Sequence, residues 1–263
     1  MRQLILILVL ANSIIYTIIF DFLKEERLVL FLDIGQGEAV LIKNNKNTYL
    51  YDTGKYPPLI LKEIDKVLPF YDRKIDILFL SHPDKDHYFS AQEILKRYEV
   101  RIVGVSVKQS NDRNYEELLA LVRRLNTPIL IFRRGDKIFD NHFHFLVLHP
   151  DKIYKKDNNN SLVIKISGKN SYLLTGDIEN EAINSLIYCC EKFLRADYFL
   201  VPHHGSRYSV DKNFYSLIKG DTAIIQVGFN FYGHPHPETL SAIKEFFPHV
   251  WRTDINKLLT VKE

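Results

Sequence analysis

From Leu28 onward, short apolar segments alternate with segments in which apolar residues recur every three or four positions. The short segments have the length and composition of strands, and the others have the period of amphipathic helices. Two β-rich halves, each carrying helices, predict two sheets packed together with helices on the outer faces, an α/β protein of the αββα type. We expect one domain over residues 28–263. The predicted strands are 28–34, 39–42, 48–51, 75–80, 101–107, 128–132, 143–148, 161–166, 172–174, 198–201, 222–227 and one near Val250, and the predicted helices are 59–68, 91–98, 115–125, 181–194, 214–218 and 238–246.

The N-terminal segment follows a different pattern. Residues 4–20 contain no charged side chain and lie at the short end of the length that spans a bilayer. We interpret residues 1–23 as a retained anchor rather than a cleaved signal, because no small-x-small cleavage site follows. A buried N-terminal helix is the third interpretation. With Arg2 on the cytoplasmic side, the protein would be a single-pass protein of the cell membrane whose remaining chain is extracytoplasmic.

Composition narrows the class of protein only a little. Hydrophobic residues make up 46% and charged residues 25%, which is typical of a globular chain and excludes a disordered one. The formal net charge of +3 is too small to indicate a nucleic-acid partner by itself. Cys189 and Cys190 cannot form a cysteine-rich zinc site, and neighbouring cysteines rarely bridge each other. We expect them to be small buried residues on a helix.

A dense polar cluster follows the predicted strand 75–80. Residues 81–87 read SHPDKDH, so two histidines and two carboxylates lie within six positions. A loop at the carboxyl end of a strand can turn all four side chains toward one point. Imidazole and carboxylate together suit Zn²⁺, Mn²⁺ or Fe²⁺, and four such groups favour a metal site over a solvated acidic turn. The candidate ligands are His82, Asp84, Asp86 and His87.

Two later strands end in the same way. Residues 173–177 are a strand segment that ends in Gly176 and Asp177, and residues 199–206 end in a pair of histidines followed by glycine and serine. An isolated Gly-Asp is usually only a turn, but here each strand delivers a ligand type at its carboxyl end. The metal site is therefore predicted to include Asp177, placed to bridge two ions, and His203 and His204.

The ordered set of these residues, preceded by Asp52, resembles the metallo-β-lactamase fold superfamily. The match is closer to the metallo-hydrolase domain of ComEC-type DNA-uptake (competence) proteins and covers about Leu28 to Thr260. Departures include Asp84 where most of the superfamily has histidine, and Glu38 where aspartate is commoner. The chain also has at most one spanning segment, whereas a full ComEC-type protein carries a many-helix channel region. The motifs that carry the resemblance are FLDIGQGEA (31–39), YDTG (51–54), HPDKDH (82–87), NSLV (160–163), LTGD (174–177), VPHHGS (201–206), YGHP (232–235) and RTD (252–254).

The resemblance implies two divalent metal ions, Mn²⁺ or Zn²⁺. One ion would take His82 and Asp84, and Asp177 would bridge to the other. The superfamily usually supplies a further histidine to the first ion, and Asn160 stands near that position here, so the first ion would be short of a ligand. The additional carboxylate favours Mn²⁺ relative to a histidine-rich zinc site. The second ion would take Asp86, His87 and one of His203 and His204.

Further residues receive catalytic or supporting roles from the same resemblance. Asp86 would also orient the attacking water, and Asp52 would support the ligands from behind. His234 would protonate the leaving group or bind phosphate, or is an ordinary loop histidine. The backbone amides of Gly205 and Ser206 would receive an anionic substrate oxygen. We expect ordinary structural roles for His142, His144 and His149.

The implied function is a membrane-anchored, metal-dependent phosphodiesterase or nuclease that acts on DNA during uptake. DNA is its expected substrate, the membrane is contacted through residues 4–20, and a separate DNA-channel protein is a candidate partner. Two alternatives stay open: an envelope phosphoester hydrolase with a small-molecule or cell-wall substrate, and a non-catalytic metal-binding module. The basic residues of the middle of the chain would line a phosphate path or form a scattered solvated surface; they are Lys96, Arg97, Arg101, Lys108, Arg123, Arg124, Arg133 and Arg134.

Overall fold

Two mixed sheets pack face to face in the computed structural model, which describes residues 8–10, 12–16, 27–68 and 72–263. The first sheet has the strand order β16-β1-β2-β3-β5-β7-β8. Strands β16 to β3 pair antiparallel, whereas β3, β5, β7 and β8 are parallel. The strands are β1 (Leu28–Phe31), β2 (Val40–Lys43), β3 (Thr48–Tyr51), β5 (Ile77–Leu80), β7 (Val103–Val105), β8 (Ile129–Ile131) and β16 (Leu259–Lys262).

The second sheet repeats this division, with the order β15-β14-β13-β12-β11-β10-β9. Strands β9 to β12 pair antiparallel, and β12 to β15 are parallel. Parallel neighbours end at one edge, so each sheet brings the loops after its parallel strands together. The strands are β9 (Lys137–Phe139), β10 (His144–His149), β11 (Val163–Ser167), β12 (Ser171–Leu174), β13 (Tyr198–Leu200), β14 (Thr222–Ile225) and β15 (His249–Arg252).

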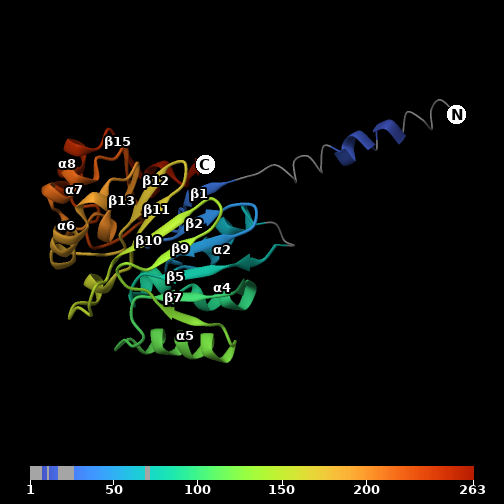
Figure 1. Cartoon of the computed structure of the whole chain (residues 1–263), viewed down its shortest axis with the longest axis horizontal. Helices are drawn as coiled ribbons and strands as arrows, with labels where there is room; N and C mark the ends of the chain where they lie inside the picture. The colour runs from blue at the N-terminus through green and yellow to red at the C-terminus, as the bar shows by residue number, and fades with distance from the viewer. Residues whose placement is uncertain (1–7, 11, 17–26, 69–71) are drawn as a thin grey trace.

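Helices cover the outer face of each sheet (Figure 1). Helices α2 (Pro57–Asp65), α4 (Ala91–Arg97) and α5 (Arg113–Arg124) pack on the first sheet, and α6 (Asn180–Leu194), α7 (Lys212–Ile218) and α8 (Pro237–Phe246) pack on the second. A third buried cluster, which includes Phe31, Tyr51, Phe79 and Phe145, fills the space between the sheets. The predicted αββα arrangement is thereby confirmed. The short helices are α3 (Lys85–Tyr88), α9 (Thr253–Asn256), η1 (Asp157–Asn160), η2 (Pro202–Gly205) and η3 (Arg207–Ser209).

Some predicted boundaries differ from the observed ones. The expected strand 75–80 is divided at Asp76: β4 (Lys74–Ile75) pairs with β6 (Glu99–Val100), and β5 begins after it. Asp76 accepts hydrogen bonds from the Thr48 amide (2.8 Å) and the Arg101 guanidinium (2.9 Å), which satisfy its carboxylate. Strands β9 and β16 were not expected. Cys189 and Cys190 were expected to be unbridged and buried, whereas the structure joins them by a disulfide, and of the two only Cys190 is buried.

The predicted anchor is only partly described. Residues 8–10 and 12–16 are helical and their side chains are exposed; the rest of the 4–20 segment lies outside the described residues. No helix within the described ranges is both long enough and apolar enough to cross a membrane.

Candidate metal centre

The candidate site lies where the parallel strands of both sheets end. Asp52 follows β3, its neighbour β5 leads into residues 81–87, and Asp177 and His203 follow β12 and β13. The topology therefore collects loops from both halves of the chain at one place, as the sequence predicts for side chains that follow strands.

Asp52 organises the first of these loops from a fully buried position. Its carboxylate accepts hydrogen bonds from the Ser81 amide (2.7 Å), the Ser81 hydroxyl (2.6 Å) and Nδ1 of His87 (2.8 Å). The backbone of Asp52 has a φ of 57°, in the left-handed region that aspartate tolerates better than most residues. Because the Ser81 hydroxyl donates to Asp52, its oxygen is left to accept from Nδ1 of His82 (2.9 Å). Asp52 thus fixes two histidines through their Nδ1 atoms.

The carboxylate of Asp177 lies between the histidines from both sheets. Its Oδ1 atom is 3.1 Å from Nε2 of His87 and 3.9 Å from Nε2 of His204. Its Oδ2 atom is 3.9 Å from Nε2 of His82 and 3.7 Å from Nε2 of His203. Each oxygen therefore faces a different pair of imidazoles, which is the geometry that a bridging carboxylate needs.

The histidine pair is divided between these two groups. His203 and His204 both have a φ of 53°, and their rings stand at 75° to each other. Nε2 of His204 is 3.2 Å from Asp86 Oδ2, and its Nδ1 donates to the carbonyl of Gln226 (2.8 Å). His203 points to the other oxygen of Asp177 instead. One histidine of the pair was expected to join the second ion, and His204 lies with that group.

Two candidate ligand groups result. The first contains His82, Asp84 and His203, with Asp84 Oδ2 3.6 Å from Nε2 of His82. His203 thus stands where the first group was expected to lack an imidazole. With this imidazole present, only the additional carboxylate of Asp84 favours Mn²⁺ over Zn²⁺. The second group contains Asp86, His87 and His204, whose potential ligand atoms lie within 4.8 Å of one another.

The unpaired atoms of the site fit divalent metal ions. Within the described part of the chain, Nε2 of His82, His87 and His204 and Oδ1 of Asp177 are buried without a hydrogen-bond partner. Buried polar atoms are nearly always paired, so four of them facing one another indicate a missing partner. Imidazoles held through Nδ1 present Nε2 as a lone pair, which is how metal-bound histidines are usually oriented. The donor set therefore suits metal ions that these residues would hold.

The site is also charged in the way that favours cations. Burial alone would raise the pKa of Asp177, but the positive charges of His87 and His203 hold it well below its usual range. Burial would likewise raise the pKa of Asp86, but the neighbouring imidazoles of His204 and His87 hold it below its usual range. Burial would lower the pKa of His204, yet Asp177 and Asp86 raise it to about 9. The carboxylates are consequently ionised near neutral pH.

Glu38 is a site residue to which the sequence reasoning assigned no role. It lies in the turn between β1 and β2, is fully buried, and has no hydrogen-bond partner for either carboxylate oxygen among the described residues. Burial raises its pKa to about 8, while the charge of His87 opposes the rise. One of its oxygens lies within 4.8 Å of ligand atoms of Asp177 and His204. Its place in the GQGE turn was visible in sequence, but only the fold brings that turn to the metal centre.

Gln226 is a second residue that sequence reasoning missed. Its side-chain amide donates to the carbonyls of Leu32 and Ala39 (both 2.8 Å) and accepts from the Ala39 amide (3.3 Å). The backbone carbonyl of Gln226 accepts a hydrogen bond from Nδ1 of His204. A single buried glutamine thus links the first sheet to the histidine of the second, across more than 180 residues of sequence.

The remaining expected residues have different places. Asn160 exchanges hydrogen bonds with the backbone of Tyr154 (2.7 and 2.9 Å), so it supports a loop. Ser206 accepts from the amide of Tyr208 (3.3 Å) at the start of η3. The His234 ring lies 5.3 Å from that of His203, and burial lowers the pKa of His234 to about 4. His149 is buried and donates to the carbonyl of Asn159 (2.7 Å), a structural contact.

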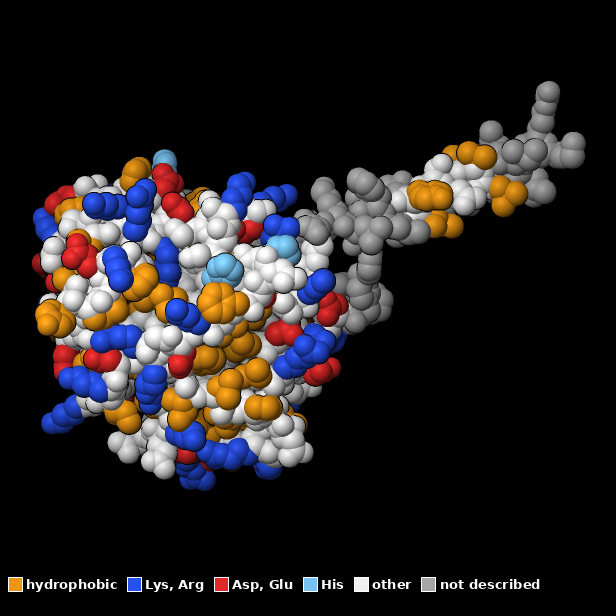
Figure 2. Space-filling model, in the orientation of Figure 1, with side chains coloured by type: hydrophobic (Ala, Val, Ile, Leu, Met, Phe, Trp, Pro, Cys, Tyr) orange, Lys and Arg blue, Asp and Glu red, His pale blue; other side chains and the backbone are white. Residues whose placement is uncertain are grey.

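Several of the basic residues considered for a phosphate path are occupied by local contacts. Arg97 pairs with Asp65 (2.9 Å), Arg101 with Asp76 (2.9 Å) and Lys96 with Glu93 (2.6 Å). On the face shown in Figure 2, Lys and Arg side chains are spread among Asp and Glu side chains rather than gathered into one stripe. A scattered solvated surface describes that face better than a basic path.

The fold and the site define the class of protein. The chain belongs to the metallo-beta-lactamase superfamily, whose family model matches residues 32–228. It is 33% identical over 262 residues to ComE operon protein 3 of Bacillus subtilis, covering 90% of this chain and 33% of that protein. It is also 33% identical over 233 residues to Recombination protein 2 of Haemophilus influenzae, covering 86% of this chain and 27% of that protein. The chain thus spans about a third or less of the length of these relatives.

The solved structures agree on the fold. The metallo-beta-lactamase fold protein YhfI from Bacillus subtilis superposes with a TM-score of 0.61 at 12% identity, over 90% of this chain and 100% of that one. The expected resemblance to the superfamily and to its competence-related branch is confirmed. A metallo-hydrolase fold with clusters suited to divalent metals follows from these findings.

Proposed function

We propose that this protein is a metal-dependent phosphodiesterase that hydrolyses DNA. The observation that carries the proposal is the division of the ligands around Asp177, with one group of imidazole and carboxylate at each of its two oxygens. Two divalent ions bound there would stabilise charge on a phosphoryl oxygen and lower the pKa of water. The resemblance to ComEC-type DNA-uptake proteins and the similarity to a relative named Recombination protein 2 support DNA as the substrate.

Side chains of the protein would supply the remaining catalytic groups. Asp86, whose carboxylate lies 3.2 Å from Nε2 of His204 and is about a quarter exposed, would accept a proton from the attacking water and orient it. The His234 ring lies 5.3 Å from that of His203 and would meet the leaving group. Its neutral imidazole can hydrogen-bond to a phosphate ester oxygen. The buried site around Asp177 also excludes bulk water, which strengthens each electrostatic contact.

The test is hydrolysis of labelled single- and double-stranded DNA by the purified full chain with Mn²⁺, Zn²⁺ or EDTA. Asp86→Asn is nearly isosteric, so the fold should survive while the charge and the proton acceptor are lost. We expect a fall in rate of about 10²–10³, the usual cost of removing one electrostatic contribution. Wild type that degrades no DNA with any divalent metal would overturn the proposal and favour a small phosphoester substrate. DNA hydrolysis that survives in Asp86→Asn would place the activity elsewhere.

The N-terminal segment bears on where the protein is located in the cell. We propose that residues 4–20, which carry no charge, anchor the protein in the cell membrane with the hydrolase domain outside, and that a separate DNA-channel protein is its partner. A spanning segment should resist extraction by high salt and alkaline carbonate. Release of the full chain by either wash would rule the anchor out, and membrane cross-linking would identify or exclude a many-helix partner.

A further inference from the structure

A hollow of about 380 Å³ adjoins the metal centre on the side of His203. Ser206 follows the histidine pair by two residues, and the rings of His234 and His203 are 5.3 Å apart, so the hollow lies beside the first ligand group. All of its lining side chains are neutral or cationic in character. They are Ser206, Arg207, Tyr208, Tyr232, His234 and His236.

The hollow presents aromatic rings to solvent. Tyr208 and Tyr232 are 53% and 77% exposed, and the adjacent Phe229 and Phe231 are 84% and 92% exposed. Large exposed rings gathered beside one site are unusual on a protein surface and mark a place that binds something. These rings are contributed by η3 and by the loop after β14, so the gathering is a product of the fold rather than of one apolar stretch.

The loop that carries Tyr232 has a defined internal structure. The side chain of Asn230 accepts from the amides of Tyr232 (3.1 Å) and His234 (3.0 Å) and donates to the carbonyls of Gly228 (2.9 Å) and His234 (2.8 Å). Four hydrogen bonds from one side chain hold the loop in shape. Tyr232 is therefore exposed on an ordered support, 5.8 Å from the His234 ring.

A cation also lines the hollow. The Arg207 guanidinium is 5.0 Å from the centre of the Tyr208 ring and donates to its hydroxyl (3.0 Å). The Lys156 ammonium lies 5.6 Å from the centre of the same ring. An aromatic platform with an arginine beside it is the combination by which proteins bind an unpaired base together with its phosphate. A base inside a duplex has both faces covered by its neighbours and cannot offer one to such a platform.

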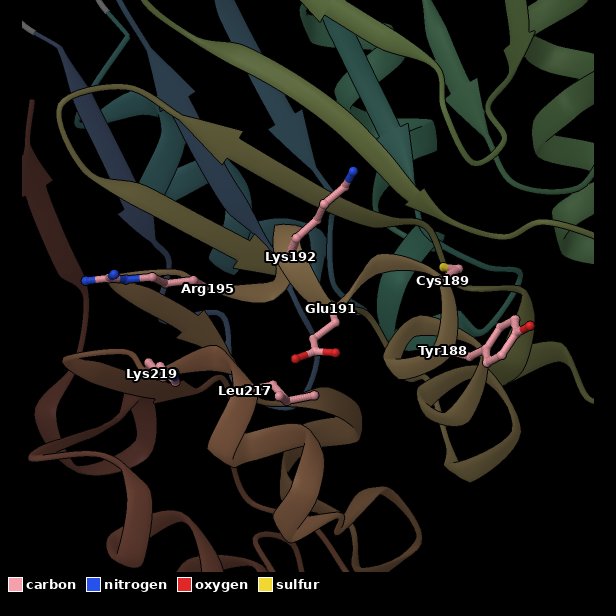
Figure 3. A pocket seen from close by; sticks show the side chains of 7 residues that line it. All are labelled: Tyr188, Cys189, Glu191, Lys192, Arg195, Leu217 and Lys219. Atoms are coloured by element: carbon pink, nitrogen blue, oxygen red, sulfur yellow. The ribbon is translucent and has the colours of Figure 1, made fainter.

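We infer that this hollow binds one unpaired nucleotide next to the phosphate that is cleaved, with its base against Tyr232 and its phosphate near Arg207. The inference rests on the proposed function and narrows its substrate to single-stranded DNA. A second hollow, on α6, does not combine a ring and a cation in this way. Figure 3 shows that the side chains of Tyr188, Lys192 and Arg195 point away from one another there. Tyr188 is 94% exposed and serves as a matched control tyrosine outside the metal centre.

The test compares a single-stranded oligonucleotide with matched strands in which one nucleotide is abasic, each position in turn. Wild type should lose about 5- to 150-fold in kcat/KM when the base beside the cleaved bond is missing, the measured range for one stacked base. Tyr232→Ala should lose a similar factor on the intact strand and no longer distinguish it from the abasic one. Tyr232→Phe, which keeps the ring, should still distinguish the intact strand from the abasic one, and Tyr188→Ala should behave as wild type.

Binding in EDTA separates this inference from the proposed function. Fluorescence anisotropy should give weaker binding of the intact strand to Tyr232→Ala than to wild type, with the abasic strand bound equally by both. If the protein hydrolyses DNA and Tyr232→Ala distinguishes the intact strand from the abasic one as well as wild type does, the nucleotide site is ruled out and the proposed function stands. No hydrolysis with any metal, together with ring-dependent binding, overturns the function and leaves the hollow as a nucleotide site. If wild type and Tyr232→Ala bind the intact and the abasic strand equally, the hollow is not a nucleotide site.

Discussion

At the scale of the residue, two histidines that are neighbours in the sequence have different partners in the structure. His203 and His204 are adjacent, yet one faces Oδ2 and the other Oδ1 of Asp177. Their left-handed backbone, with φ of 53° at both positions, is what turns successive side chains to the two groups. Such a conformation is costly for residues other than glycine, so its occurrence at both histidines is consistent with a functional constraint.

Removing either histidine should cost one metal ion, not both. His203→Ala takes an imidazole from the first group and His204→Ala from the second, so each variant should retain about one tightly bound ion per chain where wild type binds two. Metal analysis after gel filtration measures this directly. His144→Ala, at an exposed position on β10, is the control and should keep the wild-type content. A His203→Ala protein that still holds two ions would show that the first group does not use His203.

Metal binding should release protons near neutral pH. The pKa of His204 is about 9 in the metal-free protein, because Asp177 and Asp86 outweigh the effect of burial, so this ring is protonated at pH 7 and must lose its proton to bind a metal. Affinity should therefore increase as pH rises from 6 toward 9 and then level off. Calorimetric titration in two buffers of different ionisation enthalpy measures the proton count. Equal heats in both buffers at pH 7 would contradict the expectation.

At the scale of the element, the sequence is most informative where strands are buried. The parallel strands β5, β12, β13 and β14 were predicted nearly at their observed positions, because their apolar runs are bounded by turn residues. Helix α2 begins two residues earlier than predicted, at Pro57, since proline suits the first turn of a helix. Strand β9 was missed because it has only three residues, two of them exposed, and shows no distinct pattern.

The residues of the metal centre could likewise be predicted only in part. The ligand types at the strand ends were predictable because local sequence places them there. The roles of Glu38 and Gln226 and the separate placements of His203 and His204 were not, since each depends on contacts between segments far apart in the chain. Sequence order alone carries no information about which buried groups meet.

The turn before β2 offers a test at this scale. Gly37 has a φ of 136°, and a Cβ there would lie 2.4 Å from the Asp86 carbonyl oxygen, so Gly37→Ala should displace the turn or the start of α3. We expect a loss of about 2–5 kcal/mol in unfolding free energy, from strain plus overpacking. Metal affinity should fall as well, because α3 carries Asp86 and His87. Urea unfolding and metal titration measure the two effects.

Gly135→Ala is the matched control for that change. Gly135 also has a positive φ, 97°, but a Cβ there meets nothing within 4 Å. The control should lose only about 1–2 kcal/mol, the cost of a left-handed backbone, and keep the wild-type metal affinity. Similar losses of stability and of metal affinity in both variants would show that the contact with Asp86 is unimportant.

At the scale of the whole molecule, the metal centre joins the two sheets. Asp86 and His87 follow a strand of the first sheet, and Asp177 and His204 follow strands of the second, so any ion held among them links both halves of the chain. The apolar cluster between the sheets provides the other connection. Stability of the sandwich should therefore depend on bound metal.

Metal should raise the melting temperature by a measurable amount. An ion present at a thousand times its Kd adds about 4 kcal/mol to the folded state, and each kcal/mol shifts the midpoint of a protein of this size by about 2–4 °C. We expect a rise of roughly 10 °C for Mn²⁺ or Zn²⁺ over EDTA, measured by calorimetry. Asp177→Asn should remove most of this rise. An identical melting temperature with metal and with EDTA would contradict a centre that joins the sheets.

The pairing of β1 with β16 has a consequence for how the chain folds. Leu28 lies opposite Lys262, so one edge of the first sheet is completed by a strand more than 220 residues further along the sequence. Closing so long a loop costs entropy before any contact offsets it, and folds dominated by distant pairings form slowly. Until residues 259–262 arrive during synthesis, β1 exposes an unpaired apolar edge of the kind that pairs with other chains. Aggregation of nascent or truncated chains should therefore begin at this strand, and a chaperone that covers Leu28–Phe31 would suppress it.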